Sequence, residues 1–95
     1  MLKSTWDALN QLFTIAQAWN RYDGFVPDLS NPCQEKWFPW FKYNKNTAKF
    51  VYEGATYSFV STTAAFGLYV CFESRKRAEQ FGRQFVDLYN QVFLL

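Results

Sequence analysis

The sequence predicts an α+β fold: a four-stranded antiparallel meander flanked in sequence by an N-terminal and a C-terminal helix, in the order α-β-β-β-β-α. Apolar residues recur with a helical period near both ends, and the middle of the chain alternates apolar and polar residues between turn-forming residues. A length of 95 residues suits one domain, residues 1–95. We expect both helices to pack on one face of the sheet as a two-layer domain.

Residues 4–20 are predicted to form the first helix. Ser4 is a suitable N-cap, and Asp7 three residues later resembles the second half of a capping box. Asp23 and Gly24 end the helix, because glycine accepts the left-handed conformation that closes one. The large apolar side chains fall on one face: Leu2, Trp6, Leu9, Leu12, Phe13, Ala16 and Trp19.

Residues 24–36 are predicted to be a connecting loop, since Pro27 and Pro32 do not suit a central strand. The apolar side chains of Phe25, Val26 and Leu29 are expected to hold the loop against the core.

Four strands are expected over 38–43, 48–53, 55–61 and 66–72. Turns are expected at 44–46, at Glu53-Gly54 and in the small-residue stretch 62–65. Alternation sends one set of side chains to the helices: Phe50, Tyr52, Tyr57, Phe59, Phe66, Leu68, Val70 and Phe72. The opposite face carries Lys49, Val51, Thr56, Ser58, Val60, Tyr69 and Cys71.

Residues 74–93 are predicted to form the second helix, with Ser74 as its N-cap. Its apolar arc contains Ala78, Phe81, Phe85, Leu88, Tyr89 and Val92, with Gly82, Val86 and Phe93 on the flank. Its polar side carries Gln80, Arg83, Gln84, Asp87 and Asn90.

The composition excludes several classes of chemistry. The chain has no histidine, which removes histidine-based acid–base catalysis and the usual zinc-water sites. Cys33 and Cys71 are too few for a zinc site and are expected to be free thiols. We therefore expect no cofactor, no metal and no catalytic residue. No signal peptide and no membrane-length apolar run is visible, so a cytoplasmic protein without a membrane partner is expected.

The stretch "EKWFPWFKY" at residues 35–43 is the most aromatic part of the chain. Strand alternation gives Trp37, Phe41 and Tyr43 one face and Phe38, Trp40 and Lys42 the other. One set can join the core, and the other either faces outward or is covered by the 24–36 loop. The outward alternative predicts a protein-binding surface: Phe38, Trp40, Val51, Val60 and Tyr69.

Basic residues begin the second helix at Arg75, Lys76 and Arg77. Cations there oppose the helix dipole, which suggests an anion or nucleic-acid site that Lys49 would complete. The alternative is local compensation, in which Glu79 pairs with Arg75, Lys76 or Arg83, and Arg83 pairs with Asp87.

The blocks "DGFVPDLSN", "WFPWFKY" and "LYVCFESRKRAEQFGRQFVDLYNQVFLL" resemble a group of small uncharacterised proteins encoded by phages, prophages and mobile elements of gut Bacteroidales bacteria. The resemblance covers roughly residues 18–95. Its helix motif is carried by Ala78, Glu79, Phe81, Gly82, Phe85, Asp87, Leu88 and Tyr89. It implies a phage or mobile-element accessory protein in a bacterial host cell, and no activity or site residues.

Together these patterns favour a non-enzymatic module that binds another protein or itself, including as a homodimer, through an aromatic sheet surface. The alternative is single-stranded nucleic-acid binding, with bases stacked on sheet aromatics and phosphates at the basic helix start. An enzyme is the third hypothesis, and the sequence offers no motif for it.

Overall fold

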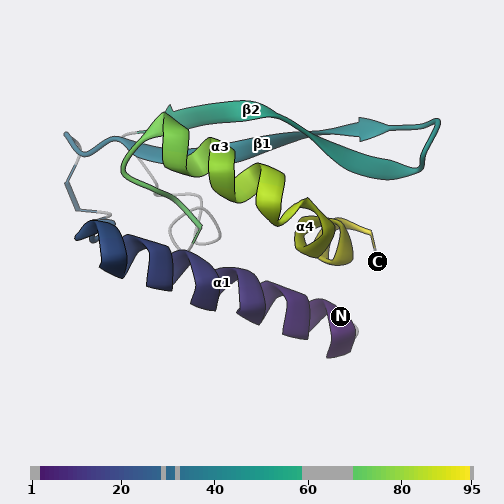
Figure 1. Cartoon of the computed structure of the whole chain (residues 1–95), viewed down its shortest axis with the longest axis horizontal. Coiled ribbons are helices and arrows are strands. Elements are labelled where there is room, and N and C mark those ends of the chain that lie inside the picture. The colour runs from purple at the N-terminus through teal and green to yellow at the C-terminus, as the bar shows by residue number, and fades with distance from the viewer. Residues whose placement is uncertain (1–2, 29, 32, 59–69, 95) are drawn as a thin grey trace.

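The computed structural model describes residues 3–28, 30–31, 33–58 and 70–94. Within these ranges the elements are α1 (Lys3–Asp23), β1 (Lys36–Asn44), β2 (Lys49–Ser58), α3 (Arg75–Gln84) and α4 (Val86–Phe93). Figure 1 shows the β1–β2 hairpin on one side of α3 and α4, and α1 on the other side. The protein is α+β, but the predicted four-stranded meander is wrong, since the described sheet has two antiparallel strands.

The predicted turn at Glu53-Gly54 is instead a β-bulge inside one long strand. Trp40 pairs with Gly54 and Phe41 pairs with Tyr52, so Glu53 is the additional residue on β2. The bulge shifts the alternation by one residue. Ala55 and Tyr57 therefore return to the helix-facing side, which Tyr52 also occupies, while Thr56 faces outward.

The predicted fourth strand is reduced to a single bridge in the described residues. Trp37 and Phe72 exchange two backbone hydrogen bonds of 2.9 and 2.7 Å on the edge of β1 away from β2. The next antiparallel pair would join Pro39 to Val70, and proline has no N–H to donate along that edge. Residues 59–69, which include the predicted turn 62–65, Phe59, Val60, Phe66, Leu68 and Tyr69, lie outside the described residues.

Helix α1 runs three residues further than predicted and ends in a Schellman motif. Gly24 adopts φ 71°, its N–H donates to Arg21, and the Phe25 N–H donates to Asn20 at 2.8 Å. The predicted buried face is wrong at Trp6, which is 51% exposed, because the buried stripe instead begins at Ala8.

The predicted second helix is divided at Phe85, which has φ −114° and ψ 23° between α3 and α4. Ser74 is confirmed as the N-cap of α3, since its side chain accepts from the Arg77 N–H at 3.3 Å. Asn90 was expected to face solvent. Instead, its side-chain amide exchanges hydrogen bonds of 2.7 and 2.8 Å with the backbone of Phe50 in β2.

The core lies where α1, α3, α4 and the 70–72 segment meet. Its buried members are Leu12, Ala16, Val70, Phe72, Ala78, Phe81 and Tyr89. Phe81 is central, with ring centroids 4.7 Å from Phe72 and 5.2 Å from Trp19. Strand alternation placed Cys71 on the outer face, whereas its apolar neighbours in sequence predicted a small buried thiol. The burial is confirmed, since Cys71 is 1% exposed where this segment enters the core.

Candidate functional site

The two ring sets of residues 37–43 separate by strand alternation. Trp37, Pro39 and Phe41 face the helices, and Trp37 and Phe41 pack against the core. On the opposite face, Trp40 is 56% exposed and Phe38 is half-buried. Val51, which pairs with Lys42 of β1, is 40% exposed.

The loop before β1 covers the beginning of the outward face. Lys36 is 2% exposed, and its ammonium group donates to the carbonyls of Asn31 and Gln34 at 3.3 and 3.2 Å. Four residues further along β1, the Trp40 side chain is exposed to solvent. Of the residues expected to hold the loop down, Phe25 is buried, Val26 is 77% exposed and Leu29 lies outside the described residues.

Trp40 lines two hollows. One of about 250 Å³ lies against Gly54, Ala55 and Thr56. The other, of about 400 Å³, is lined by Pro39, Trp40, Phe41, Phe50 and Phe93. Because Gly54 stands directly opposite Trp40 without a side chain, the indole has open space on the β2 side.

We call the partly exposed apolar side chains of the outward face of the hairpin the Trp40 surface: Phe38, Trp40 and Val51. All three were predicted from the sequence. Tyr43 and Phe93, which lie on the helix-facing side of the hairpin, are 48% and 39% exposed, and their exposure was not predicted. Phe93 ends α4 beneath the hairpin, with its ring centroid 5.0 Å from Phe50. The sequence placed Phe93 on the flank of the apolar arc of the second helix, and this position was the signal that its ring would be only partly buried.

Lysines border the Trp40 surface. Lys42 pairs with Val51 across the hairpin, Lys49 pairs with Asn44, and Lys45 lies in the turn between the strands. All three lysines are solvent-accessible, and Glu53 is the nearby acid at the bulge. The surface is therefore apolar in its middle and basic along its hairpin end.

The predicted anion site is not assembled. Lys49 lies at the turn end of the hairpin, whereas Arg75 stacks over Trp37 near the other end, with 5.0 Å from Cζ to the ring centroid. Seven residues of β1 separate these positions, or about 23 Å. Figure 1 shows α3 beginning at the end of the hairpin away from the turn.

Arg77 is engaged in a structural ion pair. Its Nε and Nη2 atoms donate to the two carboxylate oxygens of Asp23, both at 2.8 Å, and its guanidinium lies 4.9 Å from the Trp19 ring centroid. The hydrogen bonds from Arg77 lower the pKa of Asp23, and the same bonds raise the pKa of Arg77. This pair ties the end of α1 to the start of α3. Lys76 remains exposed. Glu79 forms a long ion pair with Arg83, with 3.8 Å between Glu79 Oε2 and Arg83 Nη2.

Reactive chemistry has little support among the described residues. No group of three or more histidine, cysteine, aspartate or glutamate side chains in them could hold a metal. Cys33 and Cys71 are not joined in a disulfide, and burial raises the pKa of the Cys71 thiol to about 11, so this thiol stays protonated at neutral pH. No helix within the described ranges is long and apolar enough to cross a membrane.

Searches against protein-family models, curated proteins and solved structures find no match to this chain.

Proposed function

We propose that the protein is a non-enzymatic binding module that holds a partner protein on the Trp40 surface. The observation that carries this proposal is Trp40, which is 56% exposed and lines two hollows. Tryptophan in such a position is the residue type that most often anchors protein interfaces. Trp40 lies on a paired strand, so its backbone is already ordered before a partner binds.

The energy available at Trp40 is sufficient for an anchor. A tryptophan buries up to about 250 Å² on full desolvation, so covering its exposed 56% removes about 140 Å² from water. At about 25 cal/mol per Å², this burial contributes about 3.5 kcal/mol. That value reaches the range of interface hot spots, about 2 kcal/mol or more.

The charge border indicates the kind of partner. Lys42, Lys45 and Lys49 lie beside the apolar centre, with Glu53 as the nearby acid. A two-fold contact between copies would bring the lysines of both copies together, which is unfavourable. A partner with an apolar centre and an acidic rim is therefore favoured over a second copy of the chain.

Single-stranded nucleic acid, the alternative partner, has less support from the geometry. Lys49 and Arg75 stand about 23 Å apart along the hairpin, and Arg77 already pairs with Asp23. An oligothymidine that bound with a steep salt dependence, weakened by Lys49→Gln, would favour this alternative.

Peptide display tests the proposal with an unbiased set of candidate partners. Random peptides are selected on the wild-type protein and counter-selected on Trp40→Ala, with Tyr22→Ala as the matched control. Tyr22 is an aromatic residue that is 86% exposed on α1, away from the hairpin.

We expect acidic peptides with apolar centres whose affinity, measured by calorimetry, falls at least about 30-fold in Trp40→Ala and is unchanged in Tyr22→Ala. Peptides that bind both variants equally well would contradict the proposal. A dimer in sedimentation that Trp40→Ala abolishes would make the partner a second copy.

A further inference from the structure

Asn90 caps the outer edge of β2. Phe50 pairs with Tyr43 in the hairpin, yet its backbone N–H donates to Asn90 Oδ1 at 2.7 Å and its carbonyl accepts from Asn90 Nδ2 at 2.8 Å. Because the N–H and C=O of a strand residue point to the same side, both groups of Phe50 point away from β1. The Asn90 amide therefore gives Phe50 the acceptor and the donor that a neighbouring antiparallel strand would give.

The same edge continues toward the bulge. Backbone direction alternates along a strand, so Tyr52 presents its N–H and C=O to the edge that Asn90 caps at Phe50. In the described parts of the chain, the strand that pairs with β2 is β1, on the other side. Val51, between these two residues, is 40% exposed. An exposed strand edge of this kind is a template for a further strand.

The sequence of this edge is complementary to itself. The pentapeptide "KFVYE" begins at Lys49 and ends at Glu53, and both of these charged side chains are exposed. In two antiparallel copies centred on Val51, the lysine of each copy lies opposite the glutamate of the other. The two aromatic residues inside them, Phe50 and Tyr52, also lie opposite each other. Opposite charges and paired rings across a ladder stabilise it, and a register shifted by two residues loses both charge pairs.

We propose that a second copy of this chain docks along the outer edge of β2, with Val51 on the two-fold axis. Phe50 of each copy exchanges two backbone hydrogen bonds with Tyr52 of the other copy, and Asn90 releases Phe50. Four bonds then form across the axis and four bonds to the two Asn90 amides break, so the side-chain pairs decide the affinity. The two hairpins become one four-stranded sheet in the order β1-β2-β2-β1.

This contact is separate from a partner held on the Trp40 surface. A two-fold axis perpendicular to the sheet leaves both Trp40 side chains on the same outward face. Lys49 meets Glu53 of the other copy, so the repulsion between lysines that opposes a two-fold contact on the Trp40 surface does not arise. The dimer does not depend on the proposed function of that surface.

Charge exchange tests the register. Sedimentation equilibrium over a concentration series gives the dimer Kd of the wild type and of each variant. Lys49→Glu and Glu53→Lys each place like charges opposite each other at two positions and should weaken the dimer at least about tenfold. An equimolar mixture of these two variants pairs every glutamate with a lysine and should restore the wild-type affinity. Lys45→Glu is the matched control in the turn and should leave the Kd unchanged.

Asn90→Ala tests the competition for Phe50. The substitution removes two hydrogen bonds that the monomer makes and the dimer does not, so the dimer Kd should fall at least about tenfold. Gln91→Ala, at the next and exposed position of α4, is the matched control and should have no effect. Trp40→Ala should also leave the Kd unchanged, which distinguishes this dimer from one that forms through the Trp40 surface.

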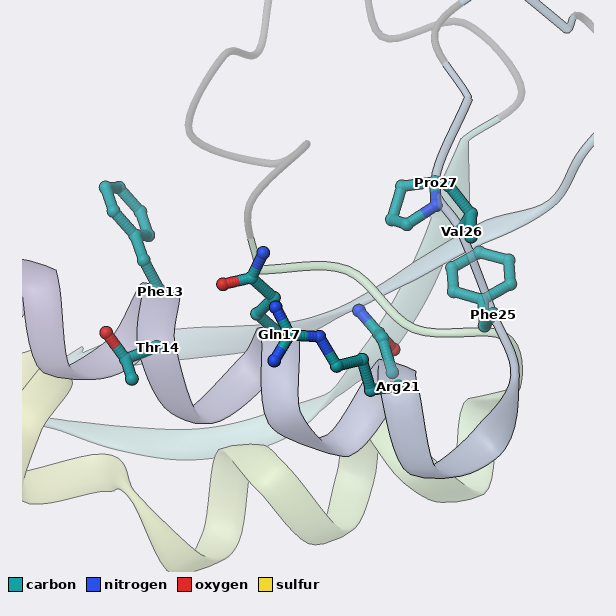
Figure 2. Close-up of a pocket in the computed structure, with 8 residues that line it drawn as sticks. Phe13, Thr14, Gln17, Arg21, Phe25, Val26 and Pro27 are labelled. Carbon is teal, nitrogen blue, oxygen red and sulfur yellow. The ribbon is translucent and has the colours of Figure 1, made fainter.

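Cysteine cross-linking tests the position of the axis. In a Cys33→Ser background, which removes the exposed native thiol, Val51→Cys places two thiols on residues whose Cα atoms are about 4.5 Å apart. This separation suits a disulfide, for which the usual range is about 4.4–6.8 Å. Val26→Cys is the matched control, because Val26 is a valine that is 77% exposed, and Figure 2 shows it in the segment after α1. Air oxidation should give a covalent dimer of Val51→Cys and not of Val26→Cys.

Three results would each overturn the proposal. The first is a wild type and an Asn90→Ala variant that both remain monomeric at millimolar concentration. The second is a mixture of the charge variants that dimerises no better than either variant alone, and the third is equal cross-linking of Val51→Cys and Val26→Cys. The charge and cysteine variants leave Asn90 in place, so they decide the matter even if circular dichroism shows that Asn90→Ala is unfolded.

Discussion

Gly82 is where helix α3 approaches the hairpin most closely, and Gly82→Ala tests this contact. A Cβ atom at Gly82 would lie 2.6 Å from the Pro39 Cβ and 2.9 Å from the Tyr52 ring. The proline ring is part of β1, so it cannot rotate away as a flexible side chain could. We therefore expect the substitution to separate α3 from the sheet or to distort one of them.

Two opposing terms set the size of the effect. Alanine favours a helix interior over glycine by about 1 kcal/mol. Overpacking a well-packed contact costs about 1–3 kcal/mol, occasionally more, and a separation of 2.6 Å places this case at the upper end. The net destabilisation of Gly82→Ala should be about 2 kcal/mol, which lowers the Tm by about 8–16 °C for a domain of this size.

Gly54→Ala is the matched control, because the same methyl group is added at a strand position with nothing within 4 Å of its Cβ. It should raise stability by about 0.5 kcal/mol, since glycine in a strand interior is entropically unfavourable. Urea unfolding followed by tryptophan fluorescence and circular dichroism measures both variants. If Gly82→Ala were as stable as the wild type or more stable, the close contact between α3 and the hairpin would be wrong.

Three further perturbations test separate features. Ala48 holds φ 56° in the hairpin turn, so Ala48→Gly should stabilise the protein by about 0.5 kcal/mol in urea unfolding, and a loss of stability would argue against this turn. The Tyr89 hydroxyl is buried without a hydrogen-bond partner, so Tyr89→Phe should raise the Tm by about 4–8 °C, whereas a fall would indicate a bond that the structure lacks. Arg77 lowers the pKa of Asp23 below 3.8, so this carboxylate stabilises the fold above its unfolded pKa and the benefit disappears as the pH falls through the folded pKa. The wild type should therefore exceed Asp23→Asn in unfolding free energy at about pH 6 but not at about pH 2, and a difference that persists in acid would contradict the ion pair.

Helical periodicity located both terminal helices, because amphipathic burial acts within a few turns of sequence. The end of α1 was also readable, since Gly24 is the residue type that the Schellman motif requires. The break between α3 and α4 at Phe85 could not be predicted from the sequence. Neither glycine nor proline occupies that position, and the Phe85 ring packs on Trp19 and Phe81, which only the tertiary fold brings together.

The strand prediction failed at Gly54 for a physical reason. Glycine after glutamate suits both a tight turn and a β-bulge, and local sequence does not separate them. Here β1 continues for enough residues to pair with both halves of β2, so the ladder passes through Gly54 and the bulge absorbs Glu53. The helix-facing side chains of β2 come out as predicted, although a bulge rather than a turn resets their alternation.

The candidate surface was predictable only as far as strand alternation reaches. Alternation separates Trp40 from Trp37 without any tertiary information. Contacts between distant segments were invisible, including the Asn90 bonds to Phe50 forty residues earlier and the Arg77 ion pair to Asp23 across 54 residues. Those contacts decide which basic residues remain available and which rings lie beside Trp40.

The exposure of Tyr43 and Phe93 follows from a mismatch in length between the hairpin and the helices below it. Strand β1 has nine residues and spans about 30 Å, and Figure 1 shows its turn projecting past the end of α4. Rings near that end, including Tyr43 and Phe93, pack against the Phe50 ring between them but have no further layer above them. A small core cannot cover so many aromatic side chains, and the overhang leaves these two rings partly exposed at the hairpin end.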